Sequence, residues 1–178
     1  SPPNKQLREL FDQAGFAPLW RIGHIWVNPN QKVCFQMSDF EARDLTEGLN
    51  GELGFRLIDW RDGFAQISVD IDHRHKNRQG GLHGGVTATL IDAATGFCGV
   101  YETDPEKRRG NVTVSLTVNF VGRAKTGTII CTAEVVRAGR RIYFASARVH
   151  DSDDNLVATA EAVYAYTDVN AQRKPSSS

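Results

Sequence analysis

The chain has 178 residues, of which 40% are hydrophobic and 24% are charged, a size and composition typical of one globular domain with a full core. Its formal net charge is zero and its pI is near 6.9. No global basic field therefore favours nucleic acid as a partner, and no acidic excess favours disorder.

The cysteines and the apolar runs indicate the cellular compartment in which the protein is expected. Cys34, Cys98 and Cys131 are odd in number, far apart and in no CxxC spacing, which argues against a disulfide framework and for a reducing compartment. No apolar run approaches the roughly 18 residues of a membrane-spanning helix, and the N-terminal SPPNKQLREL has no signal-peptide core. We expect a cytoplasmic protein without a membrane partner.

The first 50 residues are predicted to be an N-terminal extension with a short helix. Residues 4–14 have four apolar side chains at helical spacing: Leu7, Leu10, Phe11 and Ala14. Gly15 is expected to end this helix. Residues 16–50 show no clear period. The tryptophans of this segment, Trp20 and Trp26, are more typical of packing onto a main domain than of a binding surface.

Residues 51–168 are predicted to form the main domain, and the tail at 169–178 to be disordered. Alternating apolar residues predict strands at 52–60 and 64–71, a helix follows at 84–102, and four further β-rich runs come after it, at 111–121, 127–137, 141–150 and 156–167. This order is typical of an α+β fold in which an antiparallel sheet wraps around one long helix.

The stretch NRQGGLHGGVTATLIDAATGFCGVY, from Asn77 to Tyr101, combines a glycine-rich loop with that helix. At 100° per residue, one side carries a predicted core-facing stripe of Val86, Leu90, Ala93, Phe97, Val100 and Tyr101. The other side is a lane of small residues with one acid: Gly85, Ala88, Thr89, Asp92, Gly96 and Gly99. Because each helical glycine costs about 1 kcal/mol against alanine, either packed backbone or a ligand should approach this lane closely.

The run Gly80 to Gly85 (GGLHGG), followed by Leu90-Ile91-Asp92 and by a strand that begins Val112-Thr113-Val114, resembles the hotdog-fold acyl-CoA thioesterases of the PaaI-like type. The likeness covers about residues 52–167. It implies a hotdog fold and hydrolysis of an acyl-CoA without metal or cofactor.

The resemblance also implies roles for individual residues. Asp92 would be the nucleophile or general base, and the backbone N–H of Gly84 would polarise the thioester carbonyl. Asn77 and His83 would shape the site, and the Thr113 hydroxyl would position the attacking water. Each has an ordinary structural alternative as well: a surface acid, a helix cap, a turn residue or a plain strand residue.

Helix geometry makes a second chain necessary for this chemistry. Asp92 lies eight residues beyond Gly84, or about 12 Å along the axis at 1.5 Å per residue. One helix therefore cannot bring both groups to the same carbonyl. We expect a homodimer in which Asp92 meets the Gly84 of its twin, with room for further pairing into a dimer of dimers.

Other candidate residues would contact the substrate. Gly85 and Thr89 stand in the lane of small residues. Coenzyme A carries phosphates, which basic residues in the later turns would bind: Arg123, Lys125, Arg137, Arg140 and Arg141.

Three alternatives remain open from the sequence. The segment Asp70 to His75 (DIDHRH) has the side chains of a metal site, although a solvated strand end fits it better. A hotdog hydratase would need an acid where Asn77 stands. A non-catalytic acyl-CoA-binding protein on the same fold is the third alternative.

Overall fold

The computed structural model describes residues 20–22, 25–27, 45 and 47–168. The chain divides into two compact units, Ser1–Ser38 and Asp39–Ser178. In the first, β1 (Trp20–Ile22) and β2 (Ile25–Val27) form an antiparallel pair. The helix predicted at 4–14 and the tail predicted at 169–178 lie outside the described residues, and the predicted domain limits stay predictions.

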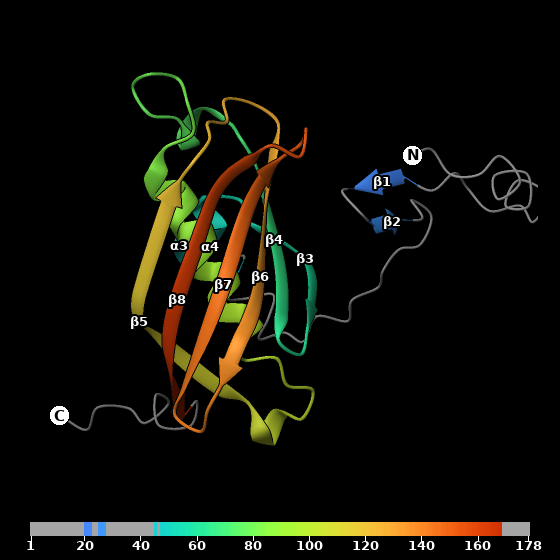
Figure 1. The fold of residues 1–178 in the computed structure, drawn as a ribbon, viewed down its shortest axis with the longest axis vertical. Coiled ribbons are helices and arrows are strands. Elements are labelled where there is room, and N and C mark those ends of the chain that lie inside the picture. The colour runs from blue at the N-terminus through green and yellow to red at the C-terminus, as the bar shows by residue number, and fades with distance from the viewer. Residues whose placement is uncertain (1–19, 23–24, 28–44, 46, 169–178) are drawn as a thin grey trace, which may run out of the picture. The chain divides into compact units, whose positions relative to one another are not determined.

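The described residues of the second unit form one sheet, one long helix and three short helices (Figure 1). Its helices are α3 (Gly48–Glu52), η1 (His73–His75), α4 (Gly84–Cys98) and η2 (Pro105–Lys107). Its strands are β3 (Arg56–Arg61), β4 (Phe64–Asp70), β5 (Arg109–Phe120), β6 (Thr128–Ala138), β7 (Ile142–Asp151) and β8 (Leu156–Asp168). All neighbouring strands pair antiparallel in the order β3-β4-β6-β7-β8-β5. The predicted α+β hotdog fold is confirmed.

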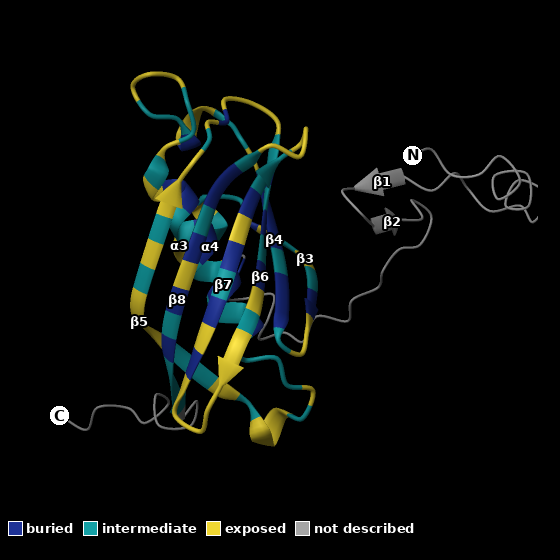
Figure 2. Ribbon diagram, viewed as in Figure 1, coloured by how far each residue is buried: buried dark blue, intermediate teal, exposed yellow. Residues whose placement is uncertain are grey.

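Small inward side chains let α4 lie close to the sheet. Along β8, Ala158, Ala160 and Ala162 are buried at alternate positions, while Glu161 between them is exposed, as expected for a strand with one covered face. Figure 2 shows the buried positions following the strands that α4 covers. No helix of the described residues is both long enough and apolar enough to cross a membrane.

Two predicted element boundaries are wrong. The strand predicted from residue 52 begins at Arg56, because α3 occupies Gly48–Glu52 and Gly54 turns the chain at a positive φ of 68°. The helix predicted to run to residue 102 ends at Cys98, where Val100 N–H bonds the Phe97 carbonyl and tightens the last turn.

The core-facing side of α4 also differs from the predicted stripe. The buried residues are Val86, Thr87, Leu90, Ile91, Ala94, Thr95 and Cys98. Ala93, Phe97 and Val100 are only half-buried. The buried side is therefore turned by roughly a quarter of the helix circumference, towards Thr95, because β4, β6 and β7 make most of the contacts between the sheet and the helix.

Candidate active site

The helix α4 begins at a loop that is held by its own polar groups. His83 is the N-cap, and its Nδ1 accepts a hydrogen bond of 2.9 Å from Gly85 N–H. Its backbone N–H donates to the His75 carbonyl at 2.8 Å. The His83 ring therefore orients the helix start, which agrees with a shaping role and leaves the Nδ1 atom occupied.

Asn77 closes the turn that precedes this helix. Its Oδ1 accepts hydrogen bonds from Gln79 N–H at 2.9 Å and Gly81 N–H at 3.2 Å. Its own N–H donates to the Gly81 carbonyl at 2.8 Å. A side chain that accepts from the backbone in this way fixes a tight turn, so Asn77 sets the path of the chain into Gly84.

Gly84 presents a backbone donor at the first position of α4. Within the described part of the chain, no acceptor contacts its N–H, as is usual for the first turn of a helix. A Cβ at this position would lie 3.4 Å from Cε1 of Phe120. A carbonyl oxygen can approach this donor more closely because Gly84 itself has no side chain.

A cavity of about 350 Å³ adjoins this donor. Its lining includes Asn77, Gly84, Phe120, Arg123 and Lys125. The structure thus brings four of the predicted site residues to one place, and it adds Phe120, which sequence reasoning did not single out.

Asp92 stands two turns further along α4 and is half-buried. Its Oδ1 accepts two hydrogen bonds, from the Thr113 hydroxyl and from the Tyr164 hydroxyl, each at 2.8 Å. Thr113 on β5, which the resemblance predicts to position the attacking water, is therefore in contact with the acid. Thr113 itself is exposed, so this part of the site is open in a single chain.

Sequence reasoning missed the tyrosine pair beneath Asp92. Tyr164 on β8 stacks on Tyr143 of β7, with ring centroids 5.0 Å apart and planes inclined by 9°. The Tyr143 hydroxyl donates towards the Gly96 carbonyl at 3.0 Å and accepts from Asn111 Nδ2 at 2.6 Å. Burial, helped by the charge of Asp92, raises the pKa of Tyr164, so its hydroxyl keeps its proton and can donate.

A signal for these tyrosines does exist in the sequence. Tyr164 occupies an alternate position of β8 that is otherwise filled by alanine, at Ala158, Ala160 and Ala162. A buried tyrosine needs a partner for its hydroxyl. The inward side of this strand therefore indicates a polar group on the helix opposite.

The tyrosines also account for part of the lane of small residues. A Cβ on Gly99 would lie 2.2 Å from Cζ of Tyr143, whereas one on Gly96 would lie 3.7 Å from Tyr164 and Asn111. Packed side chains of the sheet therefore occupy this end of the lane. At its other end, Gly85 is exposed and Thr89 is half-buried, with the Thr89 hydroxyl donating to the Gly85 carbonyl.

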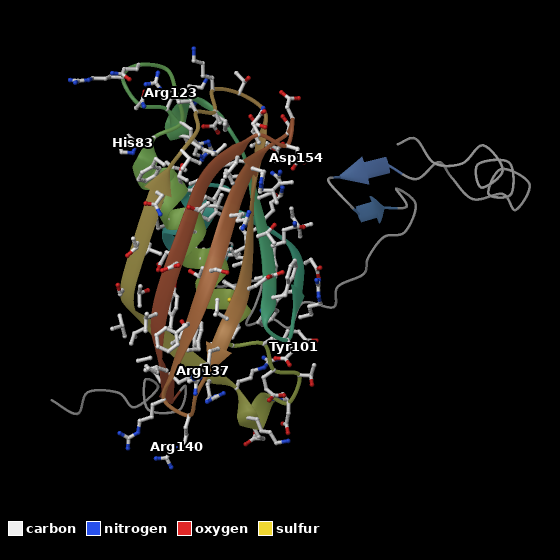
Figure 3. All side chains as sticks on the ribbon, in the orientation of Figure 1. His83, Tyr101, Arg123, Arg137, Arg140 and Asp154 are labelled. Carbon is white, nitrogen blue, oxygen red and sulfur yellow. The ribbon has the colours of Figure 1, made fainter. Side chains whose placement is uncertain are left out.

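The five predicted cations fall into two groups. Arg123 and Lys125 line the cavity beside Gly84. Figure 3 shows Arg137 and Arg140 at the opposite end of the sheet from Arg123 and His83. Arg141 follows Arg140 in the turn before β7. Within one chain, the two groups do not border the same cavity.

The segment from Asp70 to His75 is a structural turn. Asp72 caps η1 by accepting from Arg74 N–H. His75 is buried rather than solvated, since its Nδ1 accepts from Asp72 N–H and its Nε2 bonds the Leu53 carbonyl. The described residues contain no group of three or more His, Cys, Asp or Glu side chains that would hold a metal ion.

The geometry therefore describes a hotdog protein with a carboxylate on its long helix and a free backbone donor at the helix start. Residues 79–158 match the sequence profile of the Thioesterase superfamily. A Pseudomonas aeruginosa protein, PA0474, is 36% identical over 99 residues, which cover 55% of this chain and 72% of that protein. The medium/long-chain acyl-CoA thioesterase YigI of Salmonella typhimurium is 28% identical over 130 residues, covering 65% of this chain and 83% of that one.

Solved structures agree with this relationship. The conserved protein PA5202 of Pseudomonas aeruginosa has a TM-score of 0.63 at 28% identity, covering 70% of this chain and 98% of that one. The PaaI protein of the Escherichia coli phenylacetic acid degradation operon has a TM-score of 0.60 at 20% identity, covering 66% and 83%, and this likeness concerns the fold alone.

The chain belongs to the thioesterase superfamily. The predicted resemblance to hotdog-fold acyl-CoA thioesterases is confirmed, and so is the prediction of a thioester hydrolase.

Proposed function

We propose that this protein hydrolyses acyl-CoA thioesters with Asp92 of one chain and the Gly84 N–H of a second copy. The observation that carries the proposal is the environment of Asp92, whose carboxylate is held by two hydroxyls on one oxygen. Similar proteins supply the substrate class, since one of them is named a medium/long-chain acyl-CoA thioesterase.

The reaction needs a base or nucleophile, an oxyanion site and exclusion of water. As general base, Asp92 takes a proton from water while the water oxygen attacks the thioester carbon. The Gly84 N–H, at the positive end of a helix, stabilises the negative charge that forms on the carbonyl oxygen. The C–S bond then breaks, and the CoA thiolate recovers the proton from Asp92.

Thr113 is placed to help this step. Its hydroxyl donates a hydrogen bond to Asp92 Oδ1. The Thr113 Oγ1 atom still has lone pairs that can accept a hydrogen bond from water. A water held between Thr113 and Asp92 would be oriented for attack. In the alternative route Asp92 attacks the carbonyl carbon itself, and the C–S bond breaks to give an anhydride and the CoA thiolate. Water then hydrolyses the anhydride, and the thiolate takes up the proton that this step releases.

The distance between the two groups requires a second copy. Gly84 and Asp92 lie on one continuous helix, α4, and are separated by about 12 Å along its axis. Two copies related by a two-fold axis, with their α4 helices antiparallel, would place each Asp92 opposite the other Gly84 and form two equivalent sites.

The strand β5 is the surface that suits this dimer. It lies at the edge of the sheet, and an edge strand offers unpaired N–H and C=O groups to another strand. Its exposed apolar side chains include Val112 at 48%, Val114 at 62% and Phe120 at 57% (Figure 2). Pairing of β5 with its copy would also cover the exposed Thr113 and so exclude water from Asp92.

The cavity beside Gly84 supplies a place for the CoA phosphates. Arg123 and Lys125 are both exposed on its lining. A guanidinium and an ammonium group at this position suit phosphate oxygens.

A mixed-chain experiment tests the shared site. Asp92→Asn removes the base, and Gly84→Pro removes the N–H at the first helical position, where proline is well tolerated. The preceding His83 already has the extended backbone that proline requires, with φ −72° and ψ 131°. Each variant alone should release thiol from an acyl-CoA only at a low residual rate.

Unfolded chains of the two variants are then mixed and refolded together. Random pairing gives half mixed dimers, and each of these has one site with both native groups, so about a quarter of the wild-type activity should return. If the site lay within one chain, no activity would return, and the proposal of a shared site would be wrong.

The same assay separates the rival functions. Thiol release from a panel of acyl-CoAs supports hydrolysis. Hydration of crotonyl-CoA without thiol release would indicate a hydratase, and binding of an acyl-CoA without turnover would indicate a non-catalytic binding protein.

A further inference from the structure

We propose that Tyr164 is a positioning residue for Asp92, and that with Thr113 it holds Oδ1 so that Oδ2 is the oxygen that reacts. The inference rests on the proposed function and deepens it. Both hydroxyls lie 2.8 Å from the same carboxylate oxygen. Among the described residues, no donor contacts the Oδ2 atom.

Besides the neighbouring Thr113 hydroxyl, three oxygens are within reach of the one proton of the Tyr164 hydroxyl. The Thr95 hydroxyl, the Asp92 carbonyl and Asp92 Oδ1 each lie 2.8 Å away. A carboxylate is the strongest acceptor of the three when it is ionised. The proton therefore turns to Oδ1 in the charged state of Asp92, and it has two neutral acceptors available when Asp92 is protonated.

Thr95 is arranged to leave that proton available. Its own hydroxyl proton is given to the Ile91 carbonyl, one turn earlier, at 2.7 Å. The Thr95 oxygen is then an acceptor towards Tyr164 and does not compete as a donor to the carboxylate. This arrangement makes Tyr164 the proton donor of the pair.

The Tyr164 ring cannot swing away from the helix. Its side chain is buried, with 2% of the residue exposed, and it stacks on the fully buried Tyr143. Tyr143 is itself tied to α4 through the Gly96 carbonyl and to β5 through Asn111. Donors that are fixed before the reaction stabilise charge without reorganisation, so this arrangement holds the carboxylate in one rotamer.

The division between the two oxygens follows from this geometry. Oδ1 receives two donors, one from β5 and one from β8, and is occupied. Oδ2 is left to take the proton from water or to attack the substrate. A loss of either hydroxyl should let the carboxylate rotate, which affects the reaction step more than binding of the substrate.

Tyr164→Phe tests this role, because it keeps the ring and its stacking and removes only the hydroxyl. We expect kcat for acyl-CoA hydrolysis to fall about 10- to 100-fold, as for loss of a hydrogen bond to a charged group, with KM changed less than about twofold. The acid limb of the pH–rate profile should move to higher pH, since a donor lost from the carboxylate disfavours its charged form.

Tyr166→Phe is the matched control. Tyr166 lies two residues further on β8, and its ring packs against Tyr143 and under Arg109. The same chemical change at this position should leave kcat and the pH–rate profile at their wild-type values. A fall in kcat that is equal for both variants would show a general effect of weakened packing and overturn the inference.

A double variant separates this inference from the proposed function. In an Asp92→Asn background, Tyr164→Phe should reduce the residual rate no further. If Asp92→Asn alone keeps full activity, the proposed function fails. If Asp92→Asn is inactive but Tyr164→Phe keeps the wild-type kcat and pH profile, only the positioning role fails.

A second variant decides the question if Tyr164→Phe does not fold. Replacing Tyr164 with 3-fluorotyrosine keeps the hydroxyl and makes it a stronger donor. The acid limb of the pH–rate profile should then move to lower pH, and an unchanged limb would overturn the inference.

Discussion

Two glycines on the same side of α4 have different surroundings. Gly99 lies directly under the Tyr143 ring, which would be 2.2 Å from a new Cβ, while Gly96 has its nearest neighbours at 3.7 Å. Gly99 has an ordinary αR backbone, with φ −93° and ψ −4°. Glycine is therefore necessary at residue 99 because there is no room for a Cβ, and not because of the backbone conformation.

Replacing each glycine by alanine should have opposite effects on stability. Gly99→Ala forces the anchored Tyr143 ring to move, and we expect it to lower the free energy of unfolding by about 3 kcal/mol. Gly96→Ala makes ordinary contacts and improves helix propensity, so it should raise that free energy by about 0.5–1 kcal/mol. Urea denaturation of both variants measures the two changes, and a similar loss in both would contradict the assigned packing.

The sequence predicts the local part of the site better than the distant part. Asn77, His83 and Gly84 follow one another within a short loop, so their spacing alone places them together. Tyr164 is 72 residues from Asp92, and its contact depends on the register of β8 against its neighbours and on the rotation of α4. Neither is determined by local spacing, so the alternating alanines of β8 mark Tyr164 as an inward residue but do not identify Asp92 as its partner.

At the level of elements, β5 combines an open edge with apolar side chains. The strand is twelve residues long and pairs only with β8 among the described strands. Long exposed edges promote pairing with another strand, and the register shift of β5, between Thr113 and Ser115, lies in its ladder with β8. Val112 and Val114 are exposed on it, next to Thr113, so assembly and catalysis should depend on the same strand.

A single lysine on this edge should weaken the dimer. Val114→Lys places a charge in the proposed apolar interface, and two-fold symmetry would repeat it in the partner. We expect the dissociation constant of the dimer to rise about 100-fold or more. Sedimentation velocity over a range of concentrations measures this, and thiol release should fall as the monomer appears.

Val136→Lys is the control for that experiment. Val136 on β6 is 68% exposed, close to the 62% of Val114, but β6 lies inside the sheet order and away from β5. The dimer should keep its wild-type dissociation constant in this variant. An active, stable monomer of Val114→Lys would contradict the shared site.

The elements themselves were largely predictable, and their orientation was not. Alternation identifies the four strands after the helix because each has one covered face. The predicted stripe missed part of the buried side of α4, which includes the apolar Ile91, Ala94 and Cys98 as well as the polar Thr87 and Thr95. Hydrophobic periodicity gives no weight to a residue such as Thr95, whose buried hydroxyl donates to the Ile91 carbonyl of the same helix.

Although the net charge of the whole molecule is zero, its candidate phosphate-binding cations lie in two separate groups. Arg123 and Lys125 lie at the cavity beside Gly84, whereas Arg140 lies at the far end of the sheet (Figure 3). A two-fold dimer would carry the far end of one copy towards its partner. Substituting each group of cations separately therefore tests which of them binds the CoA phosphates.

Neutralising the group at the cavity should weaken substrate binding through the phosphates alone. The double variant Arg123→Gln, Lys125→Gln should raise KM for an acyl-CoA about tenfold, as expected for lost charge-assisted contacts, with kcat unchanged because these contacts are equal in the ground and transition states. For the acyl-pantetheine thioester, which lacks the nucleotide, KM should stay at the wild-type value. Added salt should reduce the difference in KM between wild type and variant, because screening weakens exposed charge pairs.

The matched variant Arg140→Gln, Arg141→Gln should keep the wild-type KM for both substrates. The opposite pattern, with KM raised only by the second variant, would mean that cations at the far end of the partner bind the phosphates and that the cavity beside Gly84 holds another part of the substrate.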